Sequence, residues 1–206
     1  MDEDKSLLPV PGGEVLGSVL IGLLHSFRDA QISLGKKFDY LAKHVQANEW
    51  YPMAYFFTAL DEAERQKSNL GPILYQAGAR FIDGFYYLNG GKTIANCAAD
   101  FLRLQSKNGG YSLVHRGDPS QIGWQDLIEM DEPAGRAVVT CVTPYPMEFE
   151  RGALHRGTSI GGDVDSVRVE SIEEPYSRYL KKKTHVITFK PKNKLDIELN
   201  LNVPNG

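Results

Sequence analysis

The residue types that most often carry out chemistry are few in this chain of 206 residues, and their spacing matches no familiar site. The histidines are His25, His44, His115, His155 and His185. No two of them are four residues apart, the spacing that places two imidazoles on one helix face to bind a metal. The two cysteines, Cys97 and Cys141, also lack a metal-ligand spacing and are expected to pack as small apolar residues. We therefore predict no metal ligands.

Several polar groupings resemble parts of known motifs but lack the rest. Gly91-Lys92-Thr93 is similar to the end of a phosphate-binding loop, yet that loop needs a glycine where this chain has Tyr86. Arg116-Gly117-Asp118 is typical of a polar turn. A catalytic site would need convergent polar groups, and the candidates for it are His115, Asp118, Arg151 and His155. Nothing in their spacing indicates such a site, so we predict that the chain is not an enzyme.

Aromatic side chains are dense between residues 81 and 101, where they alternate with glycine, alanine and cysteine. Small residues allow helices to approach one another, or they leave volume for a bound molecule. The ordinary interpretation of this pattern is a tight core, and the alternative is a ligand site. The candidate ligand-binding residues are Phe81, Phe85, Cys97, Phe101 and Trp124.

Composition and charge exclude several classes of protein. The net charge of −3 gives no basic field to attract nucleic acid. Lysines cluster at 181–183 and again at Lys190, Lys192 and Lys194, a pattern that predicts a solvated face or strand edge. The start of the chain is acidic and the longest apolar stretch, 15–24, is too short for a membrane span. We therefore expect a cytoplasmic protein with no integral membrane segment.

Periodicity predicts helices in the first half and strands in the second. The expected helices span 15–27, 34–45, 53–67, 72–85 and 93–104, with Pro52 in the first turn of the third and Gly109-Gly110 ending the fifth. The expected strands are 111–116, a hairpin of 124–130 with 136–143, and a hairpin of 164–172 with 184–189. A sixth helix starts at Pro146 and ends at Gly161-Gly162.

This order predicts an α+β domain in which a helical N-terminal half packs on a C-terminal antiparallel sheet of two hairpins with an intervening helix. We place the domain at residues 12–192, after a flexible acidic segment at 1–11 and before an extension at 193–206. In that extension, residues 195–203 alternate strictly between apolar and polar types, the pattern of a half-buried strand. It is expected either to extend the sheet or to pair with a second copy in a homodimer.

The order of elements resembles a ligand-binding superfamily that includes heme nitric-oxide/oxygen sensor domains, 4-vinyl-reductase-type domains and TRAPP transport subunits. The segments that carry the resemblance are 70–78 and 145–154, the latter followed by a glycine pair and the alternating strand 166–170. The resemblance covers about residues 12–192. It implies a sensory domain with an interior ligand pocket and a signalling partner.

The chain departs from the heme-binding members of that superfamily. They resemble one another in a proximal histidine late in the helical half and in a Tyr-x-Ser-x-Arg motif, whereas this chain has Asn96-Cys97 and Tyr176-Ser177-Arg178. We therefore predict no cofactor, with heme kept as an alternative bound by His115 or Cys97. The TRAPP resemblance implies an acyl chain in a tunnel, for which Cys97 is the residue of interest.

Two non-catalytic functions remain. The first is a sensory or regulatory domain that binds a small apolar ligand in an interior pocket and acts on a partner. The second is a dimeric adaptor with no small-molecule ligand, joined through 195–203 and without an internal cavity.

Overall fold

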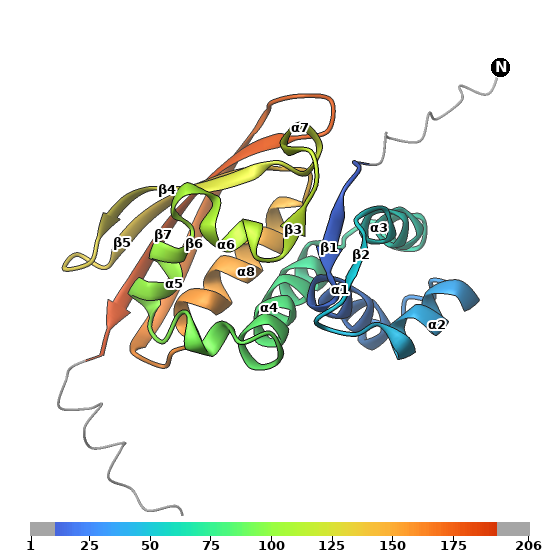
Figure 1. Cartoon of the computed structure of the whole chain (residues 1–206), viewed down its shortest axis with the longest axis horizontal. Helices are drawn as coiled ribbons and strands as arrows, with labels where there is room; N and C mark the ends of the chain where they lie inside the picture. Colours follow the sequence, from blue (N-terminus) through green and yellow to red (C-terminus); the bar gives the residue numbers. More distant parts are fainter. Residues whose placement is uncertain (1–10, 193–206) are drawn as a thin grey trace, which may run out of the picture.

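The computed structural model describes residues 11–192, and its two halves lie side by side (Figure 1). Helices of the first half occupy one side of the molecule, and a four-stranded antiparallel sheet occupies the other. Helices α4 (Gly71–Leu88) and α8 (Met147–Ser159) lie between them, with α8 against the sheet. The expected α+β class is confirmed.

The four-stranded sheet consists of two hairpins joined in the order β4-β5-β7-β6. The first pairs β4 (Trp124–Asp131) with β5 (Arg136–Thr143), and the second pairs β6 (Val164–Pro175) with β7 (Lys181–Pro191). All neighbouring strands are antiparallel, and α8 connects the hairpins. This is the arrangement that the period of two and the intervening helix predict.

The helical half is built around α4, which packs against α1 on one side and α8 on the other. The remaining helices of this half are α1 (Gly17–Asp29), α2 (Lys36–His44) and α3 (Ala54–Gln66). Each has its apolar residues on the side that faces the core, because a helix of this length is stable in water only when one face is buried.

A second, three-stranded sheet was not expected from the sequence. It pairs β1 (Glu14–Leu16) with β2 (Trp50–Pro52) on one side and with β3 (His115–Arg116) on the other. Residues 15 and 16, predicted to be helical, are therefore in a strand, and Pro52 ends a strand instead of opening a helix. Strands of two or three residues are too short to show a period of two.

The single fifth helix predicted for 93–104 is wrong. The chain instead forms a short 3₁₀ turn η1 (Gly91–Thr93) and then α5 (Ala98–Leu104). The break occurs at Cys97, whose Sγ accepts a hydrogen bond from the Asp100 N–H, while the Ala98 N–H donates to the distant Asp163 carboxylate at 3.1 Å. A capping contact from 65 residues away leaves no trace in the local pattern.

The segment that follows also differs from the prediction. A 3₁₀ turn η2 (Ser106–Asn108) leads into α6 (Gly109–Ser112), so the glycine pair begins a helical turn and does not end one. The strand predicted for 111–116 is reduced to β3. The segment is held to β4 by the Lys107 N–H, which donates to Asp126, and by Asn108, which accepts from the Gln125 N–H.

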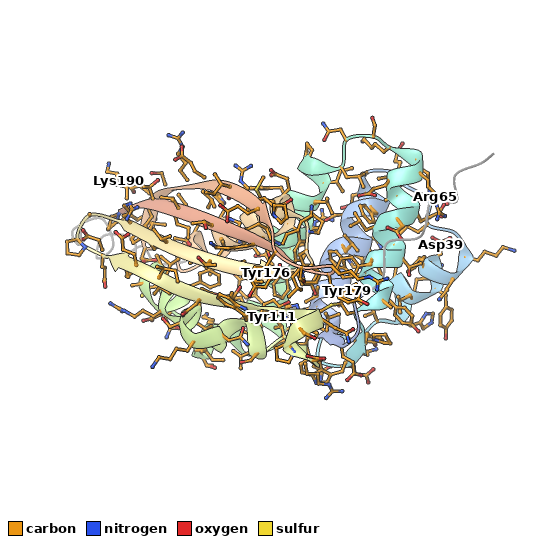
Figure 2. The ribbon with its side chains drawn as sticks, turned by 90° about the horizontal axis from the view of Figure 1, so that it is seen from above. Asp39, Arg65, Tyr111, Tyr176, Tyr179 and Lys190 are labelled. Atoms are coloured by element: carbon orange, nitrogen blue, oxygen red, sulfur yellow. The ribbon has the colours of Figure 1, made fainter. Side chains whose placement is uncertain are left out.

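The loop after β6 extends from the sheet to the helices (Figure 2). Figure 2 labels Tyr176 and Tyr179 of this loop. Tyr179 and Leu180 line a surface groove together with Phe57 of α3. The loop and α3 thus form parts of the same groove.

Two parts of the expectation lie outside the described residues: the strand 195–203 and the homodimer through it. They stay predictions. Within residues 11–192, no helix is both long enough and apolar enough to cross a bilayer.

Helices α4 and α8 approach so closely that glycine is required where they cross. A Cβ on Gly78 of α4 would lie 1.9 Å from the backbone oxygen of Phe149, and a Cβ on Gly152 of α8 would lie 1.9 Å from that of Tyr75. At this crossing, the small residues noted in the sequence thus allow the two helices to pack closely.

We expect Gly78→Ala to lower the free energy of unfolding by at least about 2 kcal/mol, because backbone on α8 must move to admit the methyl group. Gly84→Ala, in the same helix, is the matched control. Its Cβ would meet only the Ser18 Cβ at 3.3 Å, and alanine favours a helix over glycine by about 1 kcal/mol. Urea unfolding of both variants measures the difference, and equal stabilities would contradict the close crossing.

Candidate ligand cavity

A cavity of about 70 Å³ lies where α4 and α8 meet the sheet and the segment from α5 to β3. Its apolar wall includes Phe81, Phe85, Phe101, Phe149 and Leu154. All of these side chains are buried. The volume is about half of the ~150 Å³ engineered cavity known to bind benzene or xenon. In this conformation the cavity therefore admits a molecule of only a few atoms.

Three of the five candidate ligand-binding residues meet at this cavity. Phe81 and Phe85 reach it from α4, and Phe101 reaches it from α5. Cys97 is not among the lining residues, since its thiol caps α5. Trp124 is half-buried at the start of β4 and does not line the cavity either. Helical spacing identified the first group because the three rings lie on core-facing sides of their helices.

The polar edge of the cavity contains His115, which the sequence analysis considered as a catalytic group or heme ligand, and Tyr111 and Tyr145, which it missed. His115 stacks on Tyr111, with ring centroids 3.8 Å apart, and its Nδ1 lies 3.0 Å from the Tyr111 backbone oxygen. Because that oxygen can only accept, we assign the His115 proton to Nδ1. Nε2 then accepts from the Tyr145 hydroxyl at 2.8 Å. Both ring nitrogens are thus engaged.

Burial lowers the pKa of His115 to about 3, so the ring is neutral throughout the physiological range. The unfolded chain, in contrast, binds a proton at this residue near pH 6.5. Between these two values the unfolded state holds more protons, so stability falls as the pH drops below about 6.5 and the loss grows down to about pH 3.

We expect His115→Phe to reduce this acid sensitivity. At pH 5 the loss from this one group is about 2 kcal/mol, so the difference in the free energy of unfolding between pH 7 and pH 5 should shrink by about that amount. Urea titrations at the two pH values measure it, with His44→Phe at an exposed position as the control. If the His115 variant keeps the full acid sensitivity of the wild type, the assignment is wrong.

Next to the cavity lies a buried cluster of charged and polar groups between α8 and β7. The Lys183 ammonium lies 3.0 Å from the Glu150 carboxylate and donates to the backbone oxygens of Thr143 and Tyr145 at 3.2 and 2.7 Å. His185 Nε2 lies 3.3 Å from the same carboxylate. The Thr143 hydroxyl donates to the other carboxylate oxygen. Lys183 and His185 are fully buried.

Two opposed effects act on the Glu150 carboxyl. Burial alone would raise its pKa, but the Lys183 ammonium and the hydrogen bonds from His185 and Thr143 outweigh burial and hold the pKa below its ordinary value. The carboxylate is therefore charged at neutral pH. The expectation that residues 181–183 form a solvated face or edge is thus wrong for Lys183, which points into the core in phase with Ile187 and Phe189.

We expect Lys183→Met to cost about 3–5 kcal/mol of stability, because it leaves a carboxylate buried without its partner. Lys182→Met changes the neighbouring residue, which is on the other face of β7 and pairs with Glu174 at 3.5 Å in a largely exposed contact. That variant should lose about 1 kcal/mol at most. Thermal unfolding of the two variants measures the loss of stability in each. Equal losses of stability would show that the cluster is not an ion pair.

The four polar residues considered for a catalytic site do not converge. His115 lines the cavity, whereas Arg151 and His155 line a separate surface groove beside β6. Asp118 lines neither and caps the short helix α7 (Pro119–Ile122) by accepting from the Ser120 N–H. A joint site of these residues is thereby excluded.

No family model matches the sequence, and no curated protein matches it either. Solved structures do match. An oxygen-binding H-NOX domain related to soluble guanylate cyclases has a TM-score of 0.59 at 14% identity, covering 86% of this chain and 98% of that chain. An H-NOX mutant of T. tengcongensis also has a TM-score of 0.59 at 14% identity, with coverages of 86% and 100%.

At this level of identity the likeness shows the fold alone. The chain has the fold of H-NOX domains, and the expected resemblance to heme nitric-oxide/oxygen sensor domains is confirmed to that extent. The resemblance to 4-vinyl-reductase-type domains and to TRAPP subunits stays a prediction.

Proposed function

We propose that this chain is a sensory domain that holds one small, mainly apolar molecule in the cavity beside Phe81, Phe85 and Phe101, and that its occupancy is read by a partner protein. The observation that carries the proposal is the cavity itself, whose apolar wall meets a few fixed polar groups, as ligand sites in proteins do. The H-NOX fold supports it, because the structural neighbours include an oxygen-binding domain.

The polar edge indicates which molecules the cavity would accept. The Tyr145 hydroxyl gives its proton to His115, and the Glu150 carboxylate is negatively charged, so both present oxygens that accept hydrogen bonds. A neutral molecule with one O–H or N–H group suits this edge, because these oxygens can accept its hydrogen bond.

Helix α8 offers a route from the cavity to the surface. Phe149 and Leu154 of this helix line the cavity, while Arg151 donates to the Val169 backbone oxygen of β6 at 3.1 Å. A ligand that binds more tightly to the protein with α8 in one position than in another would favour that position. The contacts that α8 makes with the sheet would then shift. In this proposal the partner recognises that shift.

The adaptor alternative predicted a molecule without an internal cavity, and the cavity beside Phe101 favours the sensory function over it.

One of the matching solved structures concerns heme distortion in the H-NOX family, so the fit of heme to the residues of this chain matters. The cavity of about 70 Å³ is far below the roughly 300–1,000 Å³ of pockets that hold drug-sized ligands. Of the two ligands considered from sequence, His115 has both nitrogens engaged and Cys97 does not line the cavity. The described residues therefore do not fit heme, and the proposed function does not depend on it.

We expect benzene, used as an apolar probe, to leave the melting temperature of the wild type nearly unchanged and to raise that of Phe101→Leu. The reason is that the smaller side chain enlarges the cavity, and a ligand that binds only the folded state stabilises it. Val114→Phe, added to Phe101→Leu, places a ring in the enlarged cavity and should abolish the effect. Thermal unfolding with and without benzene measures each variant.

The matched control is Val186→Phe, also added to Phe101→Leu, which adds the same atoms on the other face of β7, away from the cavity, and should respond like Phe101→Leu alone. If the double variant with Val114→Phe is stabilised by benzene as much as the double variant with Val186→Phe, the cavity is not the binding site. If Phe101→Leu gains nothing from benzene, the proposal fails.

We also expect hemin added to the purified chain to give no stoichiometric Soret absorption that depends on His115. Absorption titrations of the wild type and of His115→Phe measure this. A one-to-one Soret band in the wild type that is lost in the variant would contradict the poor fit of heme.

A further inference from the structure

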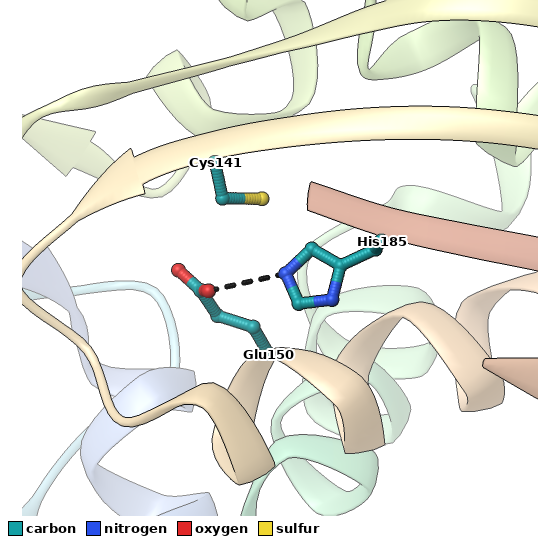
Figure 3. Close-up of side chains that lie close together, drawn as sticks. All are labelled: Cys141, Glu150 and His185. Atoms are coloured by element: carbon teal, nitrogen blue, oxygen red, sulfur yellow. Dashed lines mark hydrogen bonds and ion pairs between the residues drawn. The ribbon is translucent and has the colours of Figure 1, made fainter. Parts of the chain in front are cut away.

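Three side chains with metal-binding atoms converge beside the cavity, from three different elements (Figure 3). They are Cys141 of β5, Glu150 of α8 and His185 of β7. The thiol sulfur, a carboxylate oxygen and an imidazole nitrogen all lie within 4.8 Å of one another. All three residues are buried. Steps of 9 and 35 residues separate them along the chain, so no local pattern indicates them as a set.

We propose that Cys141, Glu150 and His185 bind a single divalent transition-metal ion of the zinc type. Zinc takes sulfur, nitrogen and oxygen ligands at about 2.0–2.3 Å in a tetrahedron, so its ligand atoms lie roughly 3.5 Å apart. The carboxylate oxygen and His185 Nε2 are already 3.3 Å apart. The sulfur lies within 4.8 Å of both, so metal binding would require it to approach by about 1 Å at most.

The groups behind these ligands are those that orient metal ligands in proteins. Ser171 Oγ lies 2.7 Å from His185 Nδ1, so it holds the ring and leaves Nε2 directed at Glu150. The Thr143 hydroxyl donates to the second oxygen of Glu150. His185 and Glu150 are thus each held by a hydrogen bond at the atom that would not bind the metal, Nδ1 of His185 and the second carboxylate oxygen of Glu150.

The fourth position of the tetrahedron would open onto the cavity, because Cys141 and Glu150 line it. Three protein ligands and one open position form the arrangement in which zinc also binds water or a small molecule. The site does not depend on the proposed apolar ligand, since Val114→Phe would fill the cavity and leave all three metal ligands unchanged.

The Lys183 ammonium lies 3.0 Å from the same carboxylate and opposes a second cation. It also donates to the backbone oxygens of Thr143 and Tyr145, which retain it when Glu150 turns toward the metal. The repulsion acts on all divalent cations alike, so the ion must be one that gains enough from the ligands to offset it. The sulfur and nitrogen ligands select against Mg²⁺ and Ca²⁺, which prefer oxygen ligands alone.

The binding step is balanced without any redox change. The Cys141 S–H proton is released to solvent and a sulfur–metal bond forms, while the imidazole nitrogen and the carboxylate donate lone pairs. His185 keeps its one proton, which moves to Nδ1 and is donated to Ser171 Oγ.

The test uses Co²⁺ as an optical probe and the fact that the chain has only two cysteines. In Cys97→Ser, a substitution that suits the helix-capping position, Cys141 is the sole cysteine. We expect one equivalent of Co²⁺ to produce a thiolate-to-cobalt charge-transfer band in this variant. X-ray absorption of the same variant loaded with Zn²⁺ should show one sulfur at about 2.3 Å and nitrogen or oxygen ligands at about 2.0–2.1 Å.

Cys97→Ser combined with Cys141→Ser is the matched control and should lose the band. If that double variant does not fold, the X-ray absorption of Cys97→Ser still decides. A charge-transfer band that is present in the wild type but lost in Cys97→Ser would place the ion at the other cysteine and overturn the proposal. Absence of any thiolate band or of zinc-bound sulfur in Cys97→Ser would overturn it as well.

Discussion

The ion pair between Glu150 of α8 and Lys183 of β7 lies where water cannot stabilise either charge. A charge in such surroundings is tolerated only when its partner and its hydrogen bonds are in place. Helix α8 must therefore keep one rotation and one distance relative to the sheet. This fixed position of α8 also determines what its other two faces meet. Gly152 lies against the backbone of α4, and Phe149 and Leu154 line the cavity.

The cavity is a consequence of this fixed geometry. Rings from α4, α5 and α8 leave about 70 Å³ unfilled beside the polar edge at His115, whose two ring nitrogens are bonded to Tyr111 and Tyr145. A void of this size costs roughly 2 kcal/mol of stability at the usual cost per unit of volume. Under the proposed function, a small apolar molecule that fills the void would regain part of that free energy on binding the folded state.

Sequence patterns were sufficient to predict the helices and strands that bury one face in the core. The alternation in both hairpins and the helical spacing in α1 to α4 and α8 predicted their type and place, and the same spacing put Phe81, Phe85 and Phe101 on core-facing sides. The patterns failed where a distant partner decides local structure, as Asp163 does at the start of α5. Short strands such as β1 also escaped detection, because their stability comes from pairing on both sides.

The polar part of the site was harder to predict, although two signals were present. Lys183 is in phase with Ile187 and Phe189, and Glu150 is four residues before Leu154 on the apolar side of α8. A charged residue in phase with core residues on each of two elements indicates a buried pair. That Cys141 and His185 lie beside this pair depends on the strand order β5-β7, which no local pattern contains.

The central claim is that the space beside Phe81, Phe85 and Phe101 can hold a small apolar guest. A crystal of the wild-type chain under xenon pressure tests it most directly, because xenon occupies apolar cavities without needing a specific hydrogen bond. The account predicts a xenon atom in contact with Phe101 and Leu154 at the cavity. A cavity that stays empty of xenon, with its walls in contact, would contradict it.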